Sequence, residues 1–188
     1  MGYNSLSANT TAEKNTAVGA SALVLNTTGA QNVAVGALTL DVNTTGGQNT
    51  ACGEGSLSEN TTASNNTALG FQALEVNTTG ANNTACGANA GDTITDGYEN
   101  TIIGSGADAD NASRVRGIAL GVNVTTHPTN FTFRVEGSNG VYHTGNTTTW
   151  STTSDERIKK DIVDSSVGLA EINKVKIRNF KYRTASEI

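Results

Sequence analysis

Aromatic side chains are scarce in this chain, and only 36% of its 188 residues are hydrophobic. With 5% aromatic residues, the sequence is thin for a compact globule built on one large core, so something else must hold the chain together. Proline is nearly absent, while glycine occurs 21 times and Asn and Thr crowd the first 150 positions. That mixture is also found in disordered chains, but a disordered chain keeps no strict register, and this sequence does.

Long hydrophobic runs are missing too, and basic residues are few in most of the chain. No run approaches the roughly 20 apolar residues of a membrane span, and no charged start leads into an apolar core at the N-terminus. We therefore expect neither membrane insertion nor Sec-type secretion. Residues 1–150 carry four basic and eleven acidic side chains, which argues against nucleic acid as a partner. Residues 151–188 carry eight basic and six acidic side chains, so the composition changes near Trp150.

What the chain does have is a repeat of 17 residues. The motif Asn-Thr-Ala-x-Gly aligns eight glycines through seven intervals, at Gly2, Gly19, Gly36, Gly53, Gly70, Gly87, Gly104 and Gly121. Asparagines precede them on the same period, and leucines form a further column at Leu6, Leu23, Leu40, Leu57 and Leu74. The triplet Asn-Thr-Thr recurs at Asn9, Asn26, Asn43, Asn60 and Asn77. We interpret the triplet as a turn, because Asn and the following Gly tolerate positive φ.

A period this short leaves room for two strands of about five residues and two tight turns in each coil. The sequence therefore predicts an all-β fold, a solenoid that stacks one repeat on the next at roughly 4.8 Å per rung. Helix is disfavoured, because Asn, Thr and Gly are poor helix formers. The stacked Asn and Thr columns are expected to form hydrogen-bonded ladders.

Two apolar columns come directly before each glycine. Adjacent strand residues face opposite sides, so both faces of this strand are apolar, and one face needs a partner beyond the coil's own interior. The nearly invariant alanine suggests a close approach between chains, so we expect a parallel homo-oligomer. Its contact and core columns are Ala17, Val18, Ala34, Val35, Ala51, Cys52, Ala68, Leu69, Ala85 and Cys86.

The two cysteines, Cys52 and Cys86, share one column and lie two rungs apart, roughly 9.5 Å along the axis. That distance excludes a disulfide within one chain. We interpret both as small core residues, and an interchain bridge or a redox role remains as the alternative. Neither histidine has a Cys, His or carboxylate at ligand spacing, so we expect no metal site, and nothing indicates a cofactor.

The repeat resembles the left-handed β-roll of trimeric autotransporter adhesin heads, whose coils also carry Asn-x-Ala-x-Gly. It is still more similar to repeats in bacteriophage tail fibres and tailspikes, over about 120 residues. That similarity is clearest in Asn83-Thr-Ala-Cys-Gly-Ala-Asn-Ala-Gly, Asn100-Thr-Ile-Ile-Gly and Gly117-Ile-Ala-Leu-Gly. The resemblance implies that the oligomer is a homotrimer.

A second resemblance follows the repeats. Residues 131–137 and 140–145 read as short strands of a β neck. The motif Ser154-Asp-Glu-Arg-Ile-Lys-Lys-Asp-Ile then resembles the opening of the C-terminal intramolecular chaperone of endosialidase-type tailspikes, which drives trimerisation and is released by self-cleavage. The resemblance implies cleavage at the Ser154–Asp155 bond, with Lys159 as the partner of Ser154. A neutral lysine can activate a hydroxyl, and the alternative is that Ser154 is an ordinary helix N-cap.

These patterns predict three parts: a solenoid shaft at 1–125, a β neck at 126–153 and a small α+β piece at 154–188, which holds only the beginning of the chaperone-like domain. We expect a structural, adhesive segment of a homotrimeric phage tail fibre or tailspike, located in the virion. Its partners are then itself, other virion tail proteins and a host cell-surface receptor such as a carbohydrate. The alternative is a head segment of a bacterial trimeric adhesin at the cell surface. No substrate-directed enzyme activity is expected, and self-cleavage at Ser154 is the one reaction considered.

Overall fold

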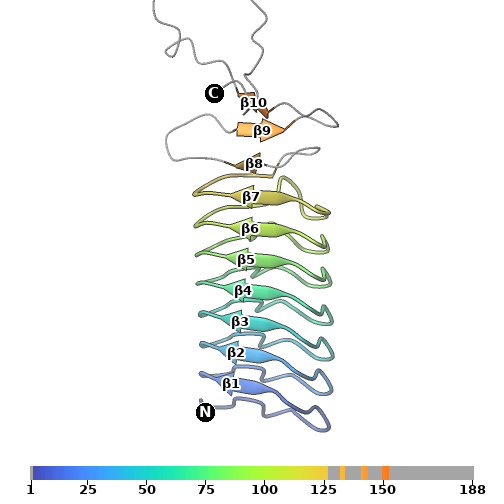
Figure 1. The fold of residues 1–188 in the computed structure, drawn as a ribbon. Coiled ribbons are helices and arrows are strands. Elements are labelled where there is room, and N and C mark those ends of the chain that lie inside the picture. Colours follow the sequence, from blue (N-terminus) through green and yellow to red (C-terminus); the bar gives the residue numbers. More distant parts are fainter. Residues whose placement is uncertain (1, 127–131, 134–140, 144–149, 153–188) are drawn as a thin grey trace, which may run out of the picture. The chain divides into compact units, whose positions relative to one another are not determined.

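The computed structural model of the chain describes residues 2–126, 132–133, 141–143 and 150–152. These residues form strands and turns without a helix, and the chain winds into a parallel β-solenoid (Figure 1). Each coil of the repeat contributes one strand of three residues: β1 (Thr16–Val18), β2 (Val33–Val35), β3 (Thr50–Cys52), β4 (Thr67–Leu69), β5 (Thr84–Cys86), β6 (Thr101–Ile103) and β7 (Ile118–Leu120). Three further strands follow: β8 (Thr132–Phe133), β9 (Val141–His143) and β10 (Trp150–Thr152).

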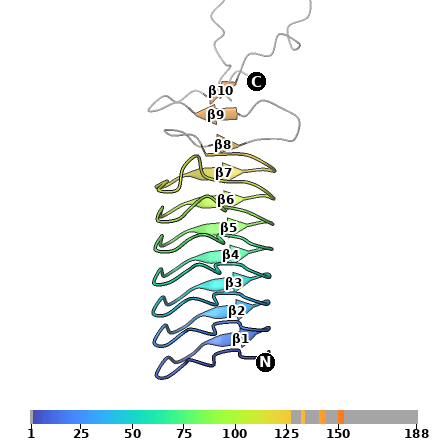
Figure 2. The ribbon, with the colours of Figure 1, turned by 180° about the vertical axis from the view of Figure 1, so that it is seen from behind.

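The strands form one sheet in chain order, from β1 to β10. Pairing is parallel from β1 to β8, and residues 17 apart are partners from β1 to β7, as in the pair Ala17 and Ala34. The pairs β8–β9 and β9–β10 are antiparallel. A solenoid with a 17-residue coil is therefore confirmed. The expectation of two five-residue strands per coil is wrong, because the rest of each coil is built of turns (Figure 2).

Each coil within residues 2–103 bends at three residues with positive φ, and the coil of residues 104–120 bends at two, which is why most of each coil is not strand. The glycine column supplies a separate corner, with φ between 129° and 143° from Gly19 to Gly121. A Cβ atom on Gly19 and its equivalents up to Gly104 would lie 2.1–2.6 Å from the backbone carbonyl group of the glycine one coil later. Conformation and stacking distance thus both require glycine at this position.

The leucine column also adopts a left-handed conformation, which is unusual for this residue type. Leu23, Leu40, Leu57 and Leu74 have φ between 51° and 52°, and their side chains are fully buried. A left-handed backbone costs an L-residue about 1–2 kcal/mol, and burial of a leucine side chain contributes about 1.5–3 kcal/mol. The burial of these side chains therefore offsets the strain of the turn that positions them.

Leu38 bears the same backbone cost without that compensation, since φ is 54° and the side chain is 48% exposed. Equivalent positions in other coils hold Gly55 and Asn89, which tolerate positive φ. We expect Leu38→Asn to raise the free energy of unfolding by about 0.5–1 kcal/mol, measured by urea denaturation followed by circular dichroism. Leu40→Asn, at a similar φ but buried, is the matched control and should be clearly destabilising. A lower midpoint for Leu38→Asn would contradict this account.

The interior of the coils has an apolar part and a part lined by asparagine amides. The alanine column and the leucine column form the apolar part, in which Ala34, Ala51, Ala68 and Ala85 are fully buried. Asparagines of the turn triplet form the first ladder: Nδ2 of Asn43 donates to Oδ1 of Asn26 at 2.8 Å and to the carbonyl of Gly46 at 3.0 Å.

The asparagines that precede the strands form a second ladder. Oδ1 of Asn49 accepts the backbone N–H of Asn66 at 3.0 Å, and its Nδ2 donates to the Ala63 carbonyl at 2.9 Å and to Oδ1 of Asn32 at 3.1 Å. A third ladder runs through threonine hydroxyls, as when Oγ1 of Thr27 donates to the Thr44 carbonyl at 3.0 Å. The predicted Asn and Thr ladders are confirmed, and they provide the hydrogen bonds that buried amides need.

In the coil of residues 87–103, which contains β6, the large apolar core residue lies in the asparagine column and not in the leucine column. Gly91 stands in the leucine column and Ile94 in the column of the first Asn ladder. Cδ1 of Ile94 lies 3.6 Å from the place where a Cβ of residue 91 would be, so the isoleucine fills the space that the missing leucine leaves. Because Ile94 cannot donate a hydrogen bond, the buried Oδ1 of Asn77 is left without a partner among the described residues.

Candidate functional site

The outward side of the sheet is a surface two residues wide, which we call the outer strip. In each strand from β1 to β7 the middle residue is buried and the two flanking residues face outward. The first column of the strip is Thr16, Val33, Thr50, Thr67, Thr84, Thr101 and Ile118. The second column is Val18, Val35, Cys52, Leu69, Cys86, Ile103 and Leu120.

The second column is apolar throughout and mostly exposed. The exposed fractions are 48% for Val18, 40% for Leu69 and 41% for Ile103, and both cysteines are exposed free thiols. The parallel register places each of these residues beside its equivalent in the next coil, so the column is continuous along the stack. A continuous apolar column of this kind typically marks an interaction surface on a soluble protein.

The ten residues of the predicted contact and core columns fall into two groups, one inside the coil and one facing outward. Ala17, Ala34, Ala51, Ala68 and Ala85 lie inside the coil, where they are 0–7% exposed. The interpretation of the alanine column as a close approach between chains is therefore wrong: alanine is small because it packs against the stacked interior of its own coil. Only Val18, Val35, Cys52, Leu69 and Cys86 of the predicted set face outward.

The interpretation of the cysteines as core residues is also wrong. Cys52 and Cys86 follow an inward alanine directly, so alternation along the strand turns their side chains outward. The sequence analysis missed the first column of the strip, although the same alternation could have revealed it. Thr16 and Val18 are two residues apart on one strand and therefore share a face.

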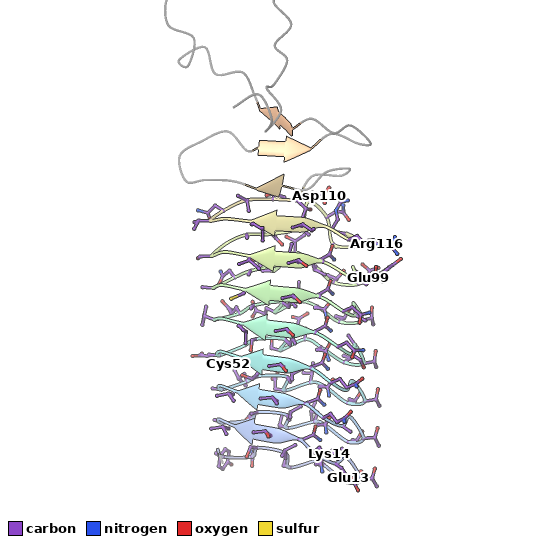
Figure 3. All side chains as sticks on the ribbon, viewed as in Figure 1. Glu13, Lys14, Cys52, Glu99, Asp110 and Arg116 are labelled. Carbon is purple, nitrogen blue, oxygen red and sulfur yellow. The ribbon has the colours of Figure 1, made fainter. Side chains whose placement is uncertain are left out.

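Charged side chains lie away from the outer strip. Residues 2–126 include ten acidic and three basic residues, and none of them occupies a strip position. Figure 3 shows Cys52 at the left of the coils and the ion pair of Glu99 and Arg116 at the right. The strip is thus the uncharged side of an otherwise acidic surface.

An acidic group lies at a turn of the coils. Partial burial, a hydrogen bond with Asp108 and repulsion from Asp108 and Glu75 raise the pKa of Asp92 from 3.8 to about 6. Because the folded chain holds this proton more tightly than the unfolded chain, the contribution of Asp92 to stability falls as the pH rises from about 4 to about 6. In the part of the chain that the structure describes, no three His, Cys, Asp or Glu side chains gather as possible ligands of a metal ion.

A cavity of about 490 Å³ opens at the first coil. Its lining has no ionisable side chain and consists of Ser5, Leu6, Asn15, Thr16, Ala17 and Val18. It therefore offers no acid, base or strong nucleophile for chemistry. Over the described ranges, the chain forms no helix that is long and apolar enough to span a bilayer.

The predicted cleavage residues Ser154, Asp155 and Lys159 lie outside the described residues, so the cleavage site stays a prediction from the sequence. No protein-family model matches the chain, and neither a curated protein nor a solved structure is significantly similar to it. The fold and the outer strip are therefore the observations from which function must be inferred.

Proposed function

We propose that the chain is the shaft of a homotrimeric fibre, a structural segment of a phage tail fibre or tailspike located in the virion. The observation that carries this proposal is the outer strip: seven coils expose apolar side chains in one uncharged column. Covering this exposed apolar column with another surface would stabilise the assembly by about 25 cal/mol for each Å² of apolar surface removed from water.

The fold supports a load-bearing role over a catalytic one. Each coil is joined to the next by strand pairing, two amide ladders and a threonine ladder, all repeated every 17 residues. Such a stack is rigid along its axis and grows by whole coils, as expected of a shaft.

The placement of the shaft in a virion rests on the sequence resemblance to phage tail fibres and tailspikes. On that proposal, residues 154–188 belong to a chaperone-like segment that promotes trimerisation, and the bond after Ser154 is its cleavage site. The partners would be two further copies of this chain, other tail proteins and a receptor on the host cell, such as a carbohydrate. Nucleic acid is not among the proposed partners, because the shaft is acidic.

Sedimentation equilibrium of the full chain tests the trimer. We expect a mass three times the chain's 19.3 kDa. Leu69→Asp should convert the trimer into monomers, because three carboxylates would be buried at one level of the interface. Val35→Asp, two coils away, should have the same effect, and circular dichroism establishes whether the released chains remain folded.

Thr62→Asp is the matched control, because Thr62 is an exposed turn residue away from the strip. The equivalent position two coils later is Asp96, so the fold accepts an aspartate there. Thr62→Asp should leave the trimer intact. A wild-type chain that sediments as a folded monomer at high concentration would overturn the proposed function.

A further inference from the structure

We propose that Cys52 and Cys86 each face their own copies in neighbouring chains, so that the assembled fibre has two levels at which disulfides can join its chains. This inference rests on the proposed trimer and adds the face through which the chains meet, their register and a covalent reaction. It follows from the position of both thiols on the outer strip.

Within one chain the two cysteines have no partner. Both are free and exposed, and Leu69 lies between them in the parallel register. Two rungs separate them by roughly 9.5 Å, which is beyond the Cα–Cα range of a disulfide. Their neighbours in the column are Val35, Leu69 and Ile103, so an apolar side chain lies on either side of each thiol along the stack.

A second copy of the chain is the occupant that best fits the outer strip. Ten acidic and three basic residues cover the remaining surface of residues 2–126, so two copies repel one another except where the uncharged strips meet. The strip repeats every 17 residues, and a second copy of the chain has the same period along its whole length. Interfaces also depend on a core without charge, which the strip supplies.

Register follows from rotational symmetry. When parallel chains are related by a rotation axis along the stack, equivalent residues lie at the same height. Cys52 then lies level with Cys52 of the other chains, and Cys86 with Cys86. The remaining second-column positions bring like apolar side chains together, such as Leu69 with Leu69.

The cross-link is an ordinary oxidation. Two thiols at one level lose two protons and two electrons, one S–S bond forms, and an external disulfide oxidant such as oxidised glutathione takes up the electrons and protons to give two thiols. Threefold symmetry limits the reaction, because three thiols at one level can form only one bond. A fully cross-linked trimer therefore holds two interchain disulfides and leaves two of its six cysteines outside them, and bonds at both levels can join all three chains.

The test oxidises dilute full-length chain with oxidised glutathione, followed by non-reducing gel electrophoresis, thiol titration and intact mass. The wild type should give covalently linked dimers and trimers, with two cysteines in every three chains left outside the interchain disulfides, each as a free thiol or as a mixed disulfide with glutathione. Cys86→Ser and Cys52→Ser should each stop at covalent dimers, with one cysteine in every three chains left outside the interchain disulfide, because one level remains. The variant that lacks both cysteines should give no cross-link.

The matched control moves the thiol off the strip: Thr62→Cys in the variant that lacks both native cysteines should form no rapid cross-link. A trimer by sedimentation whose thiols remain free, or only add glutathione singly, would overturn the inference and leave the proposed function standing. A monomer by sedimentation would overturn both. A two-chain particle with all four thiols paired would overturn the threefold arrangement.

Discussion

Gly70→Ala is expected to be one of the most damaging single substitutions in the shaft. The backbone φ of Gly70 is 143°, a value that L-residues with a side chain rarely adopt. A Cβ at this position would lie 2.4 Å from the carbonyl oxygen of Gly87. The contact is with backbone, so it can be relieved only by separating two coils. We expect a loss of more than about 3 kcal/mol in the free energy of unfolding, measured by urea denaturation.

Gly55→Ala is the control, because it tests positive φ without the close contact. Gly55 has φ of 67°, and the nearest atom to its Cβ would be Cγ of Gln72 at 3.3 Å, the movable part of a side chain. We expect a loss of only about 1–2 kcal/mol, the cost of a left-handed backbone. Equal losses for the two substitutions would show that stacking distance does not determine the glycine column.

Asn49→Asp is expected to have an effect of similar size and to depend on pH. The substitution preserves shape and still accepts the N–H of Asn66, but an ionised carboxylate cannot donate to the Ala63 carbonyl or to Oδ1 of Asn32. It also places a negative charge beside two oxygens in a fully buried position. We expect a loss of more than about 3 kcal/mol at pH 7.

The sign of the pH dependence follows from that burial. The folded chain should raise the pKa of the new carboxyl above its unfolded value of about 3.9, so stability is greatest below about pH 4 and is lost as the pH rises through the folded pKa. Gln48→Glu makes the same amide-to-acid change at an exposed neighbour and should show little of this dependence. Urea midpoints at pH 4 and pH 7 compare the two variants. If the urea midpoint of Asn49→Asp differed from that of the wild type by the same amount at pH 4 and at pH 7, the new carboxyl would not be buried and ionisable as we expect.

The stacking of the shaft could be predicted from the sequence because every coil repeats the same constraints. Glycines at a fixed period, the Asn-Thr-Thr triplet and the frequent Asn, Thr and Gly that disfavour helix all indicate a solenoid, and the Asn ladders follow from columns of one residue type. The path within a coil could not be predicted in the same way. Leucine is rare in left-handed turns, so nothing local to Leu40 or Leu57 signals that the chain bends there.

The candidate surface was only half predictable. Alternation required one apolar column inside and one outside, but composition did not decide which, since alanine suits both a narrow core and a close contact between chains. The burial of Ala51 and the exposure of Cys52 decide the question. The exchange of Gly91 and Ile94 could not be predicted either. In the sequence each residue only departs from the repeat, and the structure is needed to show that the Ile94 side chain fills the space left at Gly91.

The ladders also bear on how such a chain can change in evolution. Most contacts between coils join a residue to one 14 to 17 positions further on, so a duplicated or deleted block of 17 residues leaves every donor facing an equivalent acceptor. A block whose length is not a multiple of 17 shifts amides onto alanines and leucines. Unequal recombination between the repeats would then change the reach of the shaft in whole steps, while errors of one or two residues would be removed by selection against misfolding. The 17-residue coil is thus a unit of inheritance as well as of structure.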